Sequence, residues 1–183
     1  MGQSMTIRKT TGGETAGRKV AKPLYTPEER RRRDATSWTL VQGILAPVQF
    51  LVFLVSLALV LRYLATGAGY EAATLSIILK TFVLYLIMVT GSLWEHAVFG
   101  RYLLAPAFYW EDMVSFVVIA LHTAYLVVVL GGFAGPAVQM GIALAAYATY
   151  VVNAAQFLLK LRAARLQAAS EPELTSEGFE VLS

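Results

Sequence analysis

The sequence predicts an all-α integral membrane protein, built as a bundle of four transmembrane helices. Hydrophobic residues make up 57% of its 183 residues, charged residues only 15%, and the mean hydropathy is +0.59. This composition lies well outside the range of soluble domains. Apolar runs of about twenty residues also recur along the chain, which is the length that crosses a hydrocarbon core roughly 30 Å thick.

The amino-terminal part is predicted to be a tail followed by a short helix at the membrane surface. Residues 1–22 are rich in Gly, Thr and basic residues and lack apolar periodicity, which predicts a disordered basic tail. In TPEERRRRDAT, Thr26 is a candidate N-cap, Pro27 suits the first helical position, and Glu29 completes a capping box. Arg30 to Arg33 then face lipid headgroups, so the lipid bilayer and not nucleic acid is the expected partner.

The rest of the chain is predicted to form one membrane domain over residues 23–167, with an acidic tail after it. The four spans are predicted at about 38–64, 73–93, 112–130 and 137–161. Pro47 predicts a kink in the first span, because its ring removes a backbone donor. The segment GGFAGPA at 131–137 predicts a turn. The Glu-rich residues 168–183 predict a second disordered tail.

The distribution of charge predicts the topology. An even number of spans places both termini on one side, and basic residues flank the first span and follow the last one at Lys160, Arg162 and Arg165. By the positive-inside rule, both termini are predicted to be cytoplasmic. The stretch WEHAVFGRYLLAPAFYWED, residues 94–112, then also lies on the cytoplasmic side, within reach of a soluble metabolite.

Polar residues within the spans follow helical spacing. In the third span, Glu111, Ser115 and His122 share one stripe, and His122 lies roughly 16 Å deeper than Glu111 at 1.5 Å per residue. Because polar groups in hydrocarbon are costly, such stripes are expected to face inward and to form an interior that opens to the cytoplasm. The other spans contribute Gln42, Gln49 and Ser56, then Thr81, Tyr85, Met88, Ser92 and Glu95, and finally Asn153 and Gln156.

The ionisable residues in and below residues 94–112 are candidates for acid–base catalysis. These are Glu95, His96, Glu111, Asp112 and the mid-span His122. Each residue near the surface is equally compatible with a solvated charge, whereas a mid-span histidine on a carboxylate stripe favours function. Lys80 is expected to snorkel from the outer end of its span to the headgroups, and it receives no chemical role.

Several classes of site lack support. The chain has no cysteine, which excludes disulfides, thiolate metal sites and cysteine nucleophiles. It has no HExxH motif, no Glu-x-x-His pair and no nucleophile elbow, so neither a metal site of its own nor a serine hydrolase is predicted.

Three long segments resemble a known family. They are KPLYTPEERRRRDAT, VFGRYLLAPAFYWEDMVSFVVIALHTAYL and YATYVVNAAQFLLKLRAARLQ. They are similar to the bacterial 2-vinyl bacteriochlorophyllide hydratases over about Lys22 to Gln167. The resemblance implies hydration of the C-3 vinyl group of chlorophyllide or bacteriochlorophyllide to a 1-hydroxyethyl group, in the bacterial inner (photosynthetic) membrane. It implies no cofactor beyond the magnesium that the substrate carries, and it makes other enzymes of this pathway candidate partners.

Vinyl hydration needs a proton donor and a proton acceptor, and the candidate residues allow two arrangements. In the first, Glu111 or Asp112 protonates the terminal vinyl carbon, and His122 or the other carboxylate deprotonates water. In the second, His122 ligates the substrate's magnesium, while Glu95 and His96 move the protons.

Other residues near this stretch are candidates for substrate binding. Arg101 is expected to pair with the propionate of the pigment. Trp94, Tyr109 and Trp110 are expected to pack against the edges of the macrocycle, although the same residues suit an aromatic belt at the membrane surface. Three polar residues complete this set, and they are equally compatible with hydrogen bonds that only join helices: Ser115, Asn153 and Gln156.

Two alternative functions remain at this stage. A non-catalytic pigment-binding or assembly protein would share the aromatic mouth and a ligand histidine, but it would not need clustered carboxylates. A small transporter would carry polar stripes through both leaflets, whereas the stripes here thin out toward the outer side. The acidic cluster therefore favours an enzyme.

Overall fold

The computed structural model describes residues 23–170, with side chains placed for residues 23–166. The predicted tail at 1–22 and residues 171–183 of the second predicted tail lie outside the described residues. Within the described part the regular structure is helical. The helices are α1 (Pro27–Ala35), α2 (Ser37–Thr66), α3 (Tyr70–Phe99), α4 (Tyr109–Gly131) and α5 (Pro136–Ser170).

Helices α2 to α5 are long and apolar enough to cross a membrane, so the all-α, multi-pass prediction is confirmed. Each helix extends beyond its predicted span. The 30-residue helices α2 and α3 are about 45 Å long, which is close to the thickness of a bilayer with its headgroups. Helix α2 continues through Pro47 as a single element.

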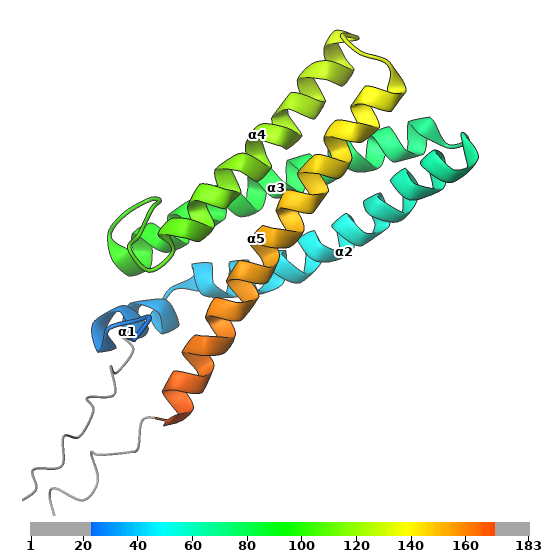
Figure 1. The fold of residues 1–183 in the computed structure, drawn as a ribbon. Coiled ribbons are helices and arrows are strands. Elements are labelled where there is room, and N and C mark those ends of the chain that lie inside the picture. Colours follow the sequence, from blue (N-terminus) through cyan, green and yellow to red (C-terminus); the bar gives the residue numbers. More distant parts are fainter. Residues whose placement is uncertain (1–22, 171–183) are drawn as a thin grey trace, which may run out of the picture.

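The four long helices form two antiparallel hairpins, α2 with α3 and α4 with α5, which cross one another (Figure 1). The tight turns after α2 and α4 lie at the same end of the bundle. They begin at Gly67 and Gly132, whose φ values of 71° and 63° are readily adopted only by residues without a Cβ. Helix α1 and the connection at residues 100–108 lie at the opposite end, where the candidate chemistry is concentrated.

Two apolar clusters hold the hairpins together. The larger cluster draws on all four long helices and includes Phe53, Ile77, Leu84, Val118, Tyr125, Met140 and Tyr147. The smaller cluster lies at the end near α1 and consists of Tyr25, Val98 and Phe108. It fixes the amino-terminal segment and the connection at 100–108 to the end of α3.

Helix α1 begins with the capping box that the sequence predicts. The Thr26 hydroxyl accepts from the Glu29 N–H at 3.2 Å, and the Thr26 N–H donates to the Glu29 carboxylate at 2.7 Å. The helix docks through Arg32, which donates to the Val98 carbonyl at 3.4 Å, and through Arg33, which lies 4.9 Å from the ring centre of Tyr25. Burial raises the pKa of Tyr25, although the nearby Arg33 opposes this shift.

Loss of the cap is expected to loosen α1 without disturbing the membrane helices. We expect Thr26→Ala to destabilise α1 by about 1 kcal/mol and to speed trypsin cleavage within Arg30–Arg33 in lipid nanodiscs. Glu28→Ala, which removes an exposed acid of the same turn, is the matched control. Equal cleavage rates for both variants would contradict the role of the cap.

Candidate active site

Two acidic residues from different hairpins meet where the connection at 100–108 folds over the bundle. Glu95 lies near the end of α3 and Asp112 near the start of α4, and their exposed fractions are 5% and 4%. Their carboxyl groups are in hydrogen-bond contact with one another. The connection supplies one backbone donor to each: the Leu104 N–H donates to Asp112 at 2.7 Å, and the Ala105 N–H donates to Glu95 at 3.2 Å.

The local sequence explains how the connection reaches this position. Gly100 ends α3 in the left-handed region with φ of 74°, which turns the chain back over the helix end. Leu104 also has a positive φ, 59°, unusual for a residue with a side chain. This conformation accompanies the N–H contact to Asp112. Ala105, completely buried, and Phe108, 1% exposed, then close the centre from outside.

The geometry of Glu95 and Asp112 suits acid–base chemistry. Two carboxyl groups can hydrogen bond to one another only when one of them carries a proton. Such a pair therefore offers a proton donor and a proton acceptor side by side, as carboxylate pairs in other enzymes do. The pair lies in a largely dry site, where proton transfers are less exposed to competition from bulk water.

Glu111 lies beside this pair but has a different partner. Its carboxylate accepts from Lys160 on α5 at 2.6 Å, in an ion pair whose side chains are 9% and 25% exposed. The Lys160 amine also lies 5.0 Å from the ring centre of Phe108, which stacks on Phe157. Glu111 is thus the counter-charge of Lys160, and this ion pair ties the start of α4 to the end of α5.

Below the acids lies a band of buried polar groups with spare hydrogen-bonding capacity. Ser115 donates to the Glu111 carbonyl at 2.9 Å and accepts from the Asn153 amide at 2.8 Å. The side-chain oxygens of Asn153 and Gln156 and both amide atoms of Gln49 are buried without a protein partner. Buried polar atoms normally find a partner, so this band is suited to bound water or to polar atoms of a ligand. Sequence reasoning placed Gln49 on an inward stripe but did not select it as a site residue.

His122 occupies a second polar centre, deeper in the bundle. It is completely buried and lies ten residues after Asp112, which is about 15 Å along α4. Its Nε2 is 2.8 Å from the amine of Lys80, and its Nδ1 is 2.7 Å from the Val118 carbonyl. The expectation that Lys80 snorkels to the headgroups is wrong, because the side chain turns into the bundle and is completely buried.

The remaining candidates lie around the acidic pair and not within it. His96 is exposed and stacks on Tyr102 with ring centres 4.2 Å apart, and Arg101 is also exposed. Trp94 is partly buried and donates through its indole N–H to Thr39 at 3.0 Å. Tyr109 and Trp110 are 43% and 71% exposed. The proposed roles of these residues stay predictions.

The structure offers little for a metal ion of the protein's own. Among the residues it describes, no three His, Asp or Glu side chains are grouped so that they could hold one. His122 brings an imidazole into the interior, but its Nε2 is in contact with Lys80. A magnesium ion carried by a substrate could bind this nitrogen only after Lys80 had moved.

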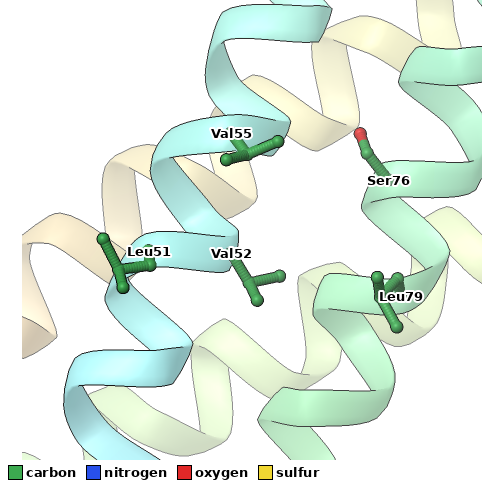
Figure 2. Close-up of a pocket in the computed structure, with 5 residues that line it drawn as sticks. All are labelled: Leu51, Val52, Val55, Ser76 and Leu79. Carbon is green, nitrogen blue, oxygen red and sulfur yellow. The ribbon is translucent and has the colours of Figure 1, made fainter.

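An apolar hollow of about 200 Å³ lies between α2 and α3, away from the acids (Figure 2). It is lined by Leu51, Val52, Val55, Ser76 and Leu79. Its one polar lining residue, Ser76, is 2.7 Å from the hydroxyl of Ser56, which in turn is 2.5 Å from that of Tyr147. The acidic pair, by contrast, is covered by the connection at 100–108, so a ligand reaches it only when this cover moves.

Removal of Lys160 is expected to leave Glu111 as an unpaired, nearly buried acid. We expect Lys160→Met to destabilise the protein by about 1–3 kcal/mol, and the double variant with Glu111→Gln to recover most of this loss. Thermal unfolding in detergent measures both effects, with Arg162→Met on the exposed face of α5 as the control. Additive effects of the two substitutions would contradict the ion pair.

Comparison with known proteins gives the same family name for the matching family model and for two relatives. The model of the family described as 2-vinyl bacteriochlorophyllide hydratase matches residues 25–163. A 2-vinyl bacteriochlorophyllide hydratase of Rhodobacter capsulatus is 70% identical over 150 residues, which cover 82% of this chain and 87% of the relative. The protein of the same name from Cereibacter sphaeroides is 71% identical over 143 residues, 78% of this chain and 89% of the relative. No solved structure matches the chain.

Proposed function

Because the chain belongs to the 2-vinyl bacteriochlorophyllide hydratase family and is therefore a hydratase of bacteriochlorophyll biosynthesis, we propose its reaction in detail. It adds water across the C-3 vinyl group of chlorophyllide a or bacteriochlorophyllide and forms the 1-hydroxyethyl group. The observation that supports this proposal best is the buried contact between Glu95 and Asp112. A hydration needs one proton delivered and one removed at neighbouring atoms, and this pair can do both.

In the proposed mechanism, one carboxyl group of the pair protonates the terminal vinyl carbon. The resulting positive charge at the inner carbon spreads into the conjugated macrocycle, and water attacks that carbon. The other carboxylate accepts the proton that the water loses. The pair then again holds one proton, which moves back along the hydrogen bond between the two groups, so that the pair returns to its starting protonation state and the charge of the site is unchanged.

The backbone donors favour one assignment of the two roles. Hydrogen bonds to an ionised acceptor are the shorter ones, and the bond from Leu104 to Asp112 is 2.7 Å, whereas the bond from Ala105 to Glu95 is 3.2 Å. We therefore assign Glu95 as the acid and Asp112 as the base. Glu111, held by Lys160, supports the neighbouring helix ends, and His122 lies too deep for the same proton transfers.

The proposed reaction takes place at the inner membrane and needs no cofactor of the protein's own. The addition of water changes no oxidation state overall, so the reaction needs no redox cofactor, and the only metal involved is the magnesium of the substrate. Helix α1, which contains Arg30–Arg33, lies at the same end of the bundle as the last part of α5, which contains Lys160, Arg162 and Arg165 (Figure 1). This arrangement supports cytoplasmic termini in the inner membrane. The product is a secondary alcohol, so a membrane-associated enzyme that oxidises alcohols would be a natural partner.

The reaction can be tested directly with the purified protein and chlorophyllide a. Loss of the conjugated vinyl group is expected to shift the absorption to the blue, and the product mass is expected to rise by one water. In deuterated water, the new methyl carbon should also gain one non-exchangeable deuterium. An unchanged pigment after incubation with folded protein would refute the proposed reaction on this substrate.

The roles of the acids can be tested by substitutions that keep their shape. We expect Glu95→Gln and Asp112→Asn each to lower kcat by about 10²- to 10⁴-fold in protein that remains folded. Glu71→Gln, an exposed acid at the other end of α3, should leave the rate unchanged. Near-normal hydration by both pair variants would refute the assignment, as would a loss of activity confined to Glu111→Gln.

A further inference from the structure

Lys80 and His122 form a contact that the proposed chemistry does not use. Lys80 belongs to the first hairpin and His122 to the second, and both are completely buried. The carbonyl of Val118 can only accept, so His122 donates to it through Nδ1 and presents a lone pair at Nε2. The Lys80 amine is thus the donor in the 2.8 Å contact with Nε2.

The surroundings of the Lys80 amine lack an acid. Its nitrogen lies 4.1, 5.4 and 6.0 Å from the ring centres of Tyr150, Tyr147 and Phe53. No carboxylate among residues 23–166 forms an ion pair with it; the ion pairs described there are Arg33 with Asp34 and Lys160 with Glu111. Contact with aromatic faces stabilises a desolvated cation by about 2 kcal/mol. Transfer of an ammonium group from water into the protein interior costs several kcal/mol, so the rings offset only part of this cost. The centre therefore has capacity for an anion.

The amine also has spare donors. A protonated lysine has three N–H groups, and His122 accepts from only one of them. If the amine is neutral in the free protein, a carboxylic acid that enters can transfer its own proton to it. A protonated amine that binds a carboxylate and a neutral amine that takes the proton of a carboxylic acid give the same ion pair. Neither process needs a further reactant.

His122 and Asp112 are both buried residues of α4, and ten residues separate them, which is about 15 Å along the helix axis. Between them lies the band of polar atoms without protein partners, which includes Gln49 and Asn153. The whole series lies where the two hairpins meet and its residues are buried, so a ligand enters only when the packing between the hairpins opens. The geometry thus suits an elongated ligand with a reactive group at one end and an acid at the other.

We propose that Lys80, held by His122, binds the carboxylate of the substrate's propionate side chain while the vinyl group lies at Glu95 and Asp112. This inference rests on the proposed function. It makes Lys80 a specificity-determining residue, because an esterified pigment carries neither the charge nor the proton that the centre requires. It also implies a reaction order in which any esterification of this carboxyl group follows hydration.

The test compares chlorophyllide a with its methyl ester in lipid nanodiscs. For the wild-type protein we expect the Kd, read from pigment fluorescence, and KM to be at least about 30-fold lower for the acid. Lys80→Met should raise both values for the acid to those of the ester, while kcat for the ester changes little. A merely structural role of Lys80 would instead weaken both pigments alike. The methionine has nearly the volume of the lysine, and substitutions in a buried core that conserve volume are the best tolerated.

Arg101→Met serves as the competing variant, because Arg101 is the exposed cation that the sequence suggests for the propionate. A preference for the acid that survives Arg101→Met and disappears in Lys80→Met supports the inference. Equal wild-type affinity for acid and ester would overturn it, as would a preference removed only by Arg101→Met. The binding measurement needs no turnover, so a wild-type protein that prefers the acid but hydrates neither pigment would refute the proposed reaction and leave the carboxylate site supported.

Discussion

Hydrocarbon offers no water to buried polar groups, and the rest of this structure depends on that constraint. Polar side chains of the interior are therefore held by partners on other helices or on the backbone, and the buried atoms of Gln49, Asn153 and Gln156 that lack one are the exceptions described above. Glu95 and Asp112 find one another and the connection at 100–108, and Glu111 finds Lys160. The contact between Glu95 and Asp112 joins the two hairpins, and the ion pair between Glu111 and Lys160 joins residues 49 positions apart within the second hairpin. The contact that joins the hairpins is therefore also the one that prepares the chemistry.

Much of the fold could be predicted because it depends on local sequence patterns. Apolar length predicts the four membrane helices, and the three-residue spacing of Thr26 and Glu29 predicts the capping box of α1. Helical periodicity correctly places Ser115 and His122 on the buried face of α4. Periodicity also indicated that Lys80 is buried, because Ala73, Ile77, Lys80 and Leu84 follow the spacing of one helical face. All four residues are buried. The position of Lys80 near the outer end of its span favoured the opposite prediction, which is wrong.

The pairing of the acids could not be predicted from periodicity. Glu95, Glu111 and Asp112 all lie close to the ends of the same connection, and their spacing is compatible with several pairings. Which two meet depends on the path of the connection and on Lys160, which comes from α5 about fifty residues later and binds Glu111. Such long-range contacts decide between residues of the same type, and a single sequence contains no local pattern that reports them. The candidate site was thus predicted as a region, while the partners within it required the structure.

The acids receive their fixed hydrogen bonds from the main chain of Leu104 and Ala105, and this has a consequence for how the protein tolerates change. A backbone N–H is present in every amino acid except proline, so the identity of the Leu104 side chain is less constrained by this contact than the path of the chain. The length of the connection, by contrast, sets where both donors fall. Insertions and deletions between Gly100 and Phe108 should therefore be far more harmful than most single replacements there, and variation among natural homologues of this segment should be in composition and not in length.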